Sequence, residues 1–83
     1  MSHSRKIKEE HRYVYQQIAH NINYFKRIRG LSTEQLAEKA NMSVSHLTAL
    51  ESPGSLKDFS FEILLDIADA LEVSIVELVK ELK

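Results

Sequence analysis

Residues that break helices are nearly absent from this chain, and the few present stand far apart. Among its 83 residues there are two glycines and one proline, which occur as Gly30 and the pair Pro53-Gly54. Between these breaks apolar residues recur at steps of three and four, the period of an α-helix, and no stretch alternates as a strand does. The sequence therefore predicts an all-α fold, a compact domain of five helices.

The apolar period sets the extent of each helix and the residues that face the core. The predicted helices cover about 13–29, 32–40, 44–51, 61–71 and 75–82. The predicted core consists of Val14, Ile18, Ile22, Phe25, Ile28, Leu36, Ala37, Ala40, Leu47, Leu50, Phe61, Leu64, Leu65, Ala68, Leu71, Ile75, Leu78, Val79 and Leu82. Ile63 and Ile67 make helix 61–71 apolar beyond one stripe, so it is expected to be the central helix.

Polar residues mark where these helices begin and end. Ser32 and Gln35 have the spacing of a capping box, in which each side chain bonds the backbone N–H of the other. Gly30 and Asn41 tolerate the left-handed backbone that ends many helices. Serines also precede the third, fourth and fifth predicted helices, at Ser43, Ser60 and Ser74.

Composition limits what such a domain can do. A chain of this length forms one domain whose small core gives only a few kcal/mol of stability, so dimerisation is expected to help. There is no cysteine, and the four histidines lack the spacing of metal ligands, so neither a metal site nor a cofactor is predicted. No catalytic motif is present, and the core is too small to shape a pocket. The chain is therefore not expected to be an enzyme.

The N-terminal residues carry no targeting pattern. Residues 1–12 are polar and charged and lack the apolar centre of a signal peptide. No apolar run approaches the roughly 20 residues that span a bilayer. Both observations favour a cytoplasmic protein without membrane contact.

Charge is divided unevenly along the chain. Residues 1–30 hold seven basic and two acidic residues, whereas residues 31–83 hold four basic and ten acidic ones. One interpretation is that the N-terminal third faces a polyanion. The other is that residues 1–12 form a basic, solvated arm without fixed structure, ahead of a domain over 13–83. The sequence leaves both open.

The second and third predicted helices are short and meet at a tight turn, an arrangement that can place a helix in the major groove of DNA. Their residues run Gly30-Leu-Ser-Thr-Glu-Gln-Leu-Ala-Glu-Lys-Ala40 and then Asn41-Met-Ser-Val-Ser-His-Leu-Thr-Ala-Leu-Glu51. This stretch resembles the Cro/CI-type helix-turn-helix of phage repressors and bacterial regulators. Residues 59–78 resemble the fourth and fifth helices of the same family. The resemblance covers about 18–82 and implies a lambda-repressor-like domain that regulates transcription.

The resemblance also implies roles for individual residues. Thr33 and Ser43 fall where the family contacts phosphates, and Glu51 falls where a glutamate pairs with a basic residue of the first helix, here Lys26. The base-reading face of the third helix falls on Val44, Ser45, Thr48 and Ala49, with His46 beside it. The loop after that helix offers one cation, Lys57, for phosphate attraction. The expected DNA-binding set is thus Thr33, Ser43, Val44, Ser45, His46, Thr48, Ala49 and Lys57.

The predicted recognition helix departs from the family because it lacks the Arg, Lys, Gln or Asn that usually reads bases. Readout would rest on hydroxyl bonds and on apolar contact with thymine methyl groups, so modest affinity is expected. Val44 also fits the edge of the core, because it precedes Leu47 by three residues. His46 also fits an exposed position without contact to DNA.

Two functions follow from these patterns. The first is a homodimer that binds an inverted repeat in double-stranded DNA, with the fifth helix expected at the dimer surface because Val76 and Val79 extend its apolar side. The alternative is a helix-turn-helix fold that binds a protein partner, such as a toxin or another regulator, and binds DNA weakly. The weak recognition helix and the acidity of residues 31–83 favour this alternative.

Overall fold

Every secondary-structure element in the described part of the chain is a helix. The computed structural model describes residues 8–51 and 60–81. A 3₁₀ turn, η1 (Glu9–His11), leads into α1 (Arg12–Ile28), which is followed by α2 (Thr33–Lys39), α3 (Val44–Glu51), α4 (Phe61–Leu71) and α5 (Ile75–Val79). The all-α prediction with five α-helices is confirmed. Residues 9–12 of the predicted arm belong to η1 and to the start of α1.

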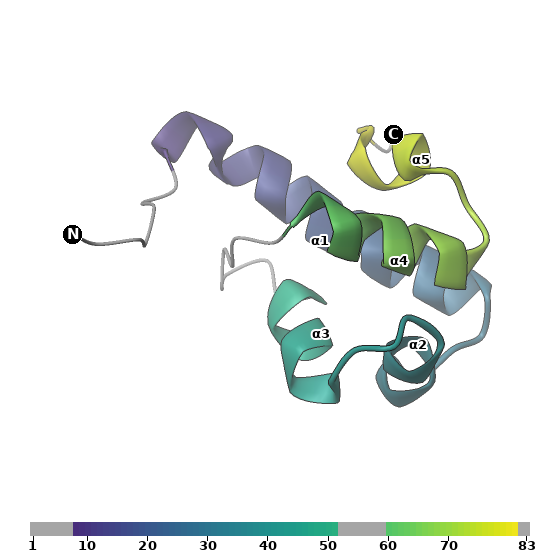
Figure 1. The fold of residues 1–83 in the computed structure, drawn as a ribbon. Coiled ribbons are helices and arrows are strands. Elements are labelled where there is room, and N and C mark those ends of the chain that lie inside the picture. The colour runs from purple at the N-terminus through teal and green to yellow at the C-terminus, as the bar shows by residue number, and fades with distance from the viewer. Residues whose placement is uncertain (1–7, 52–59, 82–83) are drawn as a thin grey trace.

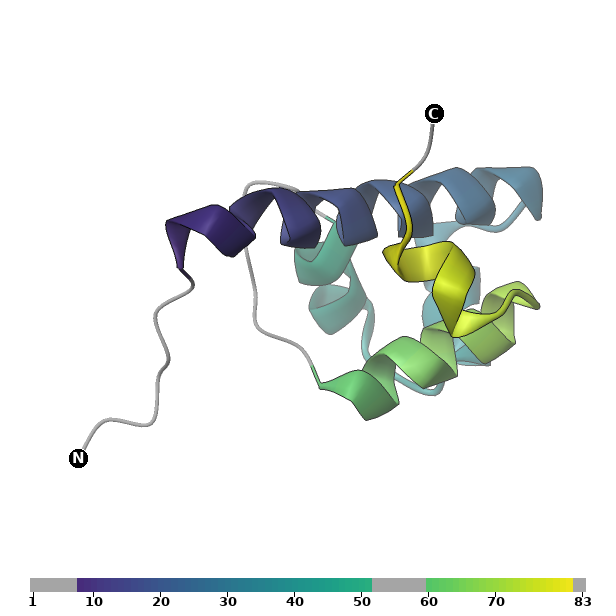
Figure 2. The ribbon, with the colours of Figure 1, turned by 90° about the horizontal axis from the view of Figure 1, so that it is seen from above.

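Helix α1 lies along one edge of the bundle; α3, α4 and α5 pack against one side of it, and α2 packs against α3 and α4. Figure 1 shows α2 and α3 below α1, α5 above it, and α4 across the middle. In Figure 2 the start of α1 projects beyond the other helices, whereas its second half is covered by them. The first buried side chain of α1 is accordingly Ile18.

The core lies where the five helices meet. Its buried residues are Ile18, Ile22, Leu36, Ala37, Ala40, Leu47, Leu50, Leu64, Ile67, Ala68, Ala70, Leu71 and Leu78. Helix α4 contributes five of them, which confirms that it is the central helix.

Four residues predicted to face the core are exposed instead. Phe61 is 63% exposed, Ile28 is 53% exposed, and Val14 and Val79 are also exposed. All four lie in the first or last turn of their helix. A periodic stripe identifies the inward face of a helix, but the neighbouring helices do not extend far enough to cover its ends. Leu82 lies outside the described residues.

The chain reverses where the sequence indicated. Gly30 has φ 69° and Asn41 has φ 58°, both in the left-handed region. The Ser32–Gln35 capping box is present, with Ser32 Oγ accepting from the Gln35 N–H at 3.1 Å and the Ser32 N–H donating to Gln35 Oε1 at 2.8 Å. Glu72 also adopts the left-handed conformation at the end of α4, which the sequence did not indicate.

Helix α5 is shorter than predicted, because it ends at Val79 rather than Leu82. Lys80 is extended, and its carbonyl accepts from Asn21 Nδ2 at 2.7 Å. The same nitrogen donates to the Leu78 carbonyl at 2.8 Å. Since Asn21 satisfies carbonyls that a longer helix would use, its side chain ends α5 and fixes that end to α1.

Candidate functional site

The turn between α2 and α3 is closed by local hydrogen bonds. The Met42 N–H donates to the Ala37 carbonyl at 2.9 Å, and Asn41 supplies the left-handed residue between them. Ser43 then caps α3, because its Oγ accepts from the His46 N–H at 3.1 Å. The predicted cap is confirmed, and the turn fixes the angle between the two helices.

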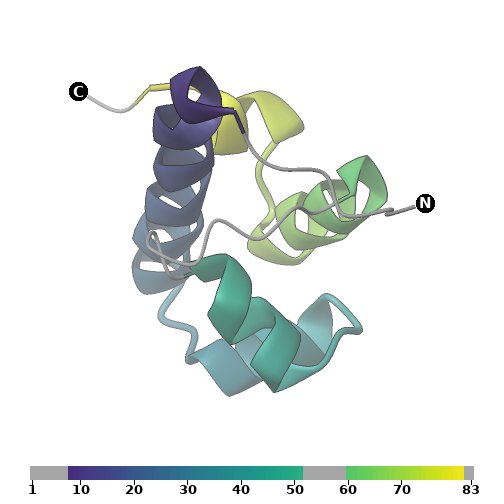
Figure 3. The ribbon, with the colours of Figure 1, turned by 90° about the vertical axis from the view of Figure 1, so that its left-hand side faces the viewer.

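Helix α3 is buried on one side only. Leu47 and Leu50 are its buried residues. Ser45 and Thr48 are exposed, and His46 and Ala49 are half-buried. Val44 is 42% exposed, so a large part of its side chain stays outside the core. In Figure 3, α3 lies at the lower front of the bundle with no described helix in front of it. The structure thus brings the predicted base-reading residues together on one open surface.

A polar network joins the end of α3 to α1 and α2. Lys26 Nζ donates to Glu51 Oε1 at 3.1 Å and to Thr33 Oγ1 at 2.8 Å. Thr33 Oγ1 donates to the same Glu51 oxygen at 3.0 Å. The side chains of Lys26 and Glu51 are only 14% and 10% exposed. The resemblance implied the Lys26–Glu51 pair, and the structure contains it.

The network bears on the expected phosphate contact of Thr33. The hydroxyl hydrogen of Thr33 is used by Glu51, so the Thr33 side chain has no proton left for a phosphate oxygen. The buried Glu51 Oε2 has no hydrogen-bond partner among the described residues. Lys26 has a single ammonium nitrogen, whereas an arginine could bond both carboxylate oxygens through two nitrogens. This explains why only Oε1 of Glu51 is bonded.

A second side chain of α1 holds the same end of α3. Asn23 Nδ2 donates to the Glu51 carbonyl at 2.9 Å and to the Ala19 carbonyl of its own helix at 3.2 Å. Sequence reasoning did not single out Asn23. The available signal was an asparagine in the interior of a helix, where the residue type is disfavoured unless its amide has a partner.

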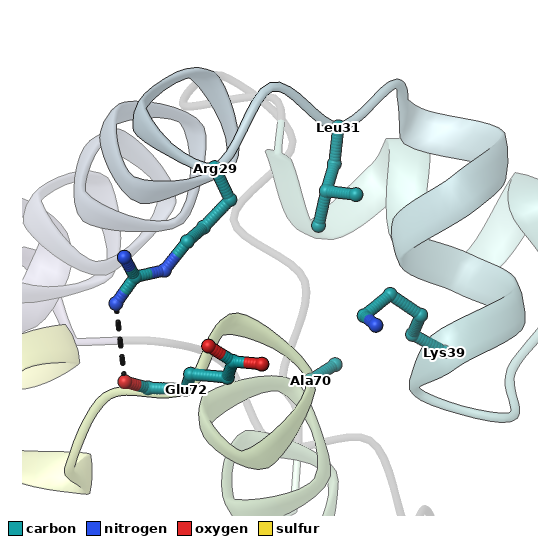
Figure 4. A pocket seen from close by; sticks show the side chains of 5 residues that line it. All are labelled: Arg29, Leu31, Lys39, Ala70 and Glu72. Carbon is teal, nitrogen blue, oxygen red and sulfur yellow. Dashed lines mark hydrogen bonds between the residues drawn. The ribbon is translucent and has the colours of Figure 1, made fainter.

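A small pocket lies between the ends of α1, α2 and α4. Figure 4 shows Arg29 reaching from α1 toward Glu72, with Leu31, Lys39 and Ala70 around the opening. Its volume of about 170 Å³ is below the range of ligand sites. The guanidinium is already engaged, since Nε donates to the Leu71 carbonyl at 2.7 Å and Nη2 to the Glu72 carbonyl at 3.2 Å. Arg29 therefore caps α4.

Residues 8–51 and 60–81 contain no cluster of three or more His, Cys, Asp or Glu side chains that could hold a metal ion. The same residues include no helix long and apolar enough to cross a membrane. Lys57, the loop cation expected to contact phosphates, lies outside the described residues.

Comparison with known proteins adds two findings. A family model described as helix-turn-helix matches residues 25–78, from the end of α1 to α5. The crystal structure of the hypothetical transcription factor NHTF from Neisseria is similar, with 20% sequence identity and a TM-score of 0.77. The match covers 96% of this chain and 88% of that one. No curated protein matches the chain.

Proposed function

Because the chain belongs to the Cro/CI-type helix-turn-helix family of DNA-binding regulators, we propose that it binds specific sequences in double-stranded DNA and thereby regulates transcription. The observation that carries the proposal is the open face of α3, which is held at both ends while its outer residues stay accessible. An α-helix of this kind fits the major groove, which is about 12 Å wide.

In the proposed complex, the residues of the α3 face make different contacts with DNA according to the type of their side chains. Ser45 and Thr48 hydroxyls bond base edges, while Val44 and Ala49 contact thymine methyl groups. Ser43 and His46 lie at the first turn of α3, where phosphates approach its N-terminus. Lys57 attracts phosphates without reading sequence. Thr33 begins α2, where backbone N–H groups meet a phosphate, while its hydroxyl stays bonded to Glu51.

We further propose that the protein acts in the cytoplasm as a homodimer on an inverted repeat. Symmetric dimers of this family type place two recognition helices about one helical turn of DNA apart. Exposed Val76 and Val79 on α5 leave apolar surface that a second copy can cover.

The test is selection of bound duplexes from a randomised DNA pool at about 0.15 M salt, followed by fluorescence anisotropy over a range of salt concentrations. We expect an enriched inverted repeat and a steep fall of affinity with salt, because phosphate contacts release counterions. Selection of no motif would reject the proposed function.

The alternative function, a module that binds a protein partner, is favoured by one specific observation. Helix α3 carries neither Lys nor Arg and exposes Val44 at its first turn. An apolar protein contact through α3 would change little with salt, so the slope of affinity against salt distinguishes the two functions.

A further inference from the structure

The outer face of α1 carries a stripe of residues that no described helix covers. Residues spaced alternately by three and four lie on one face of a helix. On α1 and the η1 turn before it, this spacing selects Glu10, Tyr13, Gln17, His20, Tyr24 and Arg27. Five of the six are exposed and Gln17 is half-buried. We refer to these six residues as the α1 stripe.

The α1 stripe includes two exposed aromatic side chains. Tyr13 is 66% exposed and Tyr24 is 40% exposed. Tyr24 is held in place by an edge-on contact with Phe25, at a ring-centroid distance of 5.0 Å. Exposed aromatic side chains are enriched at protein–protein contacts.

When two copies of the α1 stripe run in opposite directions, complementary residues lie opposite each other. In an antiparallel pair of α1 helices, Glu10 lies opposite Arg27 of the second copy, Tyr13 opposite Tyr24, and Gln17 opposite His20. Neither Glu10 nor Arg27 has an ion-pair partner among residues 8–51 and 60–81. A two-fold axis would form each contact twice, with opposite charges at both ends and aromatic rings between them.

The residues on either side of the α1 stripe show where this pairing places α3. Asn23 and Lys26, which bond the end of α3, lie on one side of the stripe, and Asn21, which bonds the end of α5, lies on the other. A two-fold axis perpendicular to paired antiparallel helices leaves both copies of α3 on the same side of the pair. Figure 3 shows the outer side of α1 clear of the other helices, as this arrangement requires.

We propose that a second copy of this chain docks antiparallel on the α1 stripe, so that two α3 helices face the same duplex. The inference rests on the proposed homodimer and places the dimer interface on α1 instead of α5. Helix α5 has five residues, so it offers a shorter face than the α1 stripe.

The test is sedimentation equilibrium over a range of protein concentrations, with circular dichroism as a check of folding. Glu10→Arg and Arg27→Glu should each raise the dimer dissociation constant by roughly tenfold, because each creates two repulsive contacts by symmetry. The double variant Glu10→Arg with Arg27→Glu should restore the wild-type constant to within about threefold, since the pairs are then reversed rather than lost. Asp66→Arg on the exposed side of α4 is the matched control and should leave the constant unchanged.

Wild-type protein that stays monomeric at all concentrations would overturn the inference, as would single variants that dimerise normally or a double variant that is not rescued. DNA selection with the same proteins separates this failure from failure of the proposed function. A monomer that still selects a DNA motif rejects the α1 interface and the homodimer but leaves DNA recognition standing, whereas absence of a motif rejects DNA recognition whatever the mass.

Discussion

Helices α3 and α4 are held in the bundle in different ways. Helix α4 has 11 residues and buries five side chains, which are Leu64, Ile67, Ala68, Ala70 and Leu71. Helix α3 has eight residues and buries two, Leu47 and Leu50. Its ends are held by hydrogen bonds instead, from Ser43 at the start and from α1 at Glu51.

The difference follows from what each helix leaves open. A central helix can be fixed by apolar contacts on most of its surface. A helix that must offer one side to a partner has less apolar surface to bury, so directional polar contacts at its ends fix its orientation. We therefore expect substitutions in α4 to lower the free energy of unfolding most. Substitutions in α3 and at its ends should affect DNA affinity more than stability.

The largest effect on stability is expected from Ile67→Ala in α4. Ile67 is completely buried, and its truncation leaves a cavity, so the free energy of unfolding should fall by about 2–5 kcal/mol. Urea denaturation followed by circular dichroism measures this change. The control is Asp66→Ala on the exposed side of the same helix, with an expected change within about 0.5 kcal/mol. A loss below about 1 kcal/mol for Ile67→Ala would contradict the central role of α4.

Removal of the Lys26 amine comes next. Lys26→Met leaves the buried Glu51 carboxylate without its ion pair and should lower the free energy of unfolding by about 3 kcal/mol. The double variant Lys26→Met with Glu51→Leu removes both charges and should recover much of the loss. Denaturation of both variants under the same conditions gives the comparison. Equal stability of the two variants would show that the unpaired carboxylate is not the cause.

A smaller effect is expected where asparagines bond helix ends. Asn23→Ala and Asn21→Ala each remove a donor to carbonyls, of α3 and α5 respectively, and should each cost about 1–3 kcal/mol. DNA affinity of the folded protein, measured by anisotropy well below the unfolding temperature, should fall for Asn23→Ala and not for Asn21→Ala. Equal affinities would mean that the end contact does not orient α3.

The smallest effect on stability is expected for Ser45→Ala combined with Thr48→Ala. Both side chains are exposed, so the free energy of unfolding should stay within about 0.5 kcal/mol of wild type. Affinity for the selected duplex should fall by roughly tenfold or more, while affinity for unrelated DNA is unchanged. Anisotropy with the two duplexes measures both. Unchanged specific affinity would remove α3 from the recognition surface.

Local sequence signals predicted the helices and the turns of this protein well. The bounds of α3 and α4 agree with the structure, and the capping box and the left-handed Gly30 and Asn41 are present. These features depend on residues within a few positions of one another, so a sequence pattern can specify them. The Lys26–Glu51 pair is a long-range contact that only the family resemblance implied.

The features that sequence patterns missed depend on distant partners. Asn21 is a polar residue that is completely buried, because its amide bonds the end of α5. The same contact ends α5 at Val79, three residues before the apolar pattern stops. Phe61 follows the stripe of α4 but lies at its first turn, beyond the cover of neighbouring helices. A pattern among nearby residues does not show where a distant helix packs.

Two side chains of α1 and that of Arg29, the residue after it, hold the carbonyl ends of three other helices, with Asn23 on α3, Arg29 on α4 and Asn21 on α5. Such an arrangement makes unfolding cooperative, because α1 cannot detach without releasing all three helix ends at once. Amide protons in α3, α4 and α5 should then exchange with solvent in a single global opening rather than helix by helix. The whole domain would therefore respond to a change at α1 as one unit.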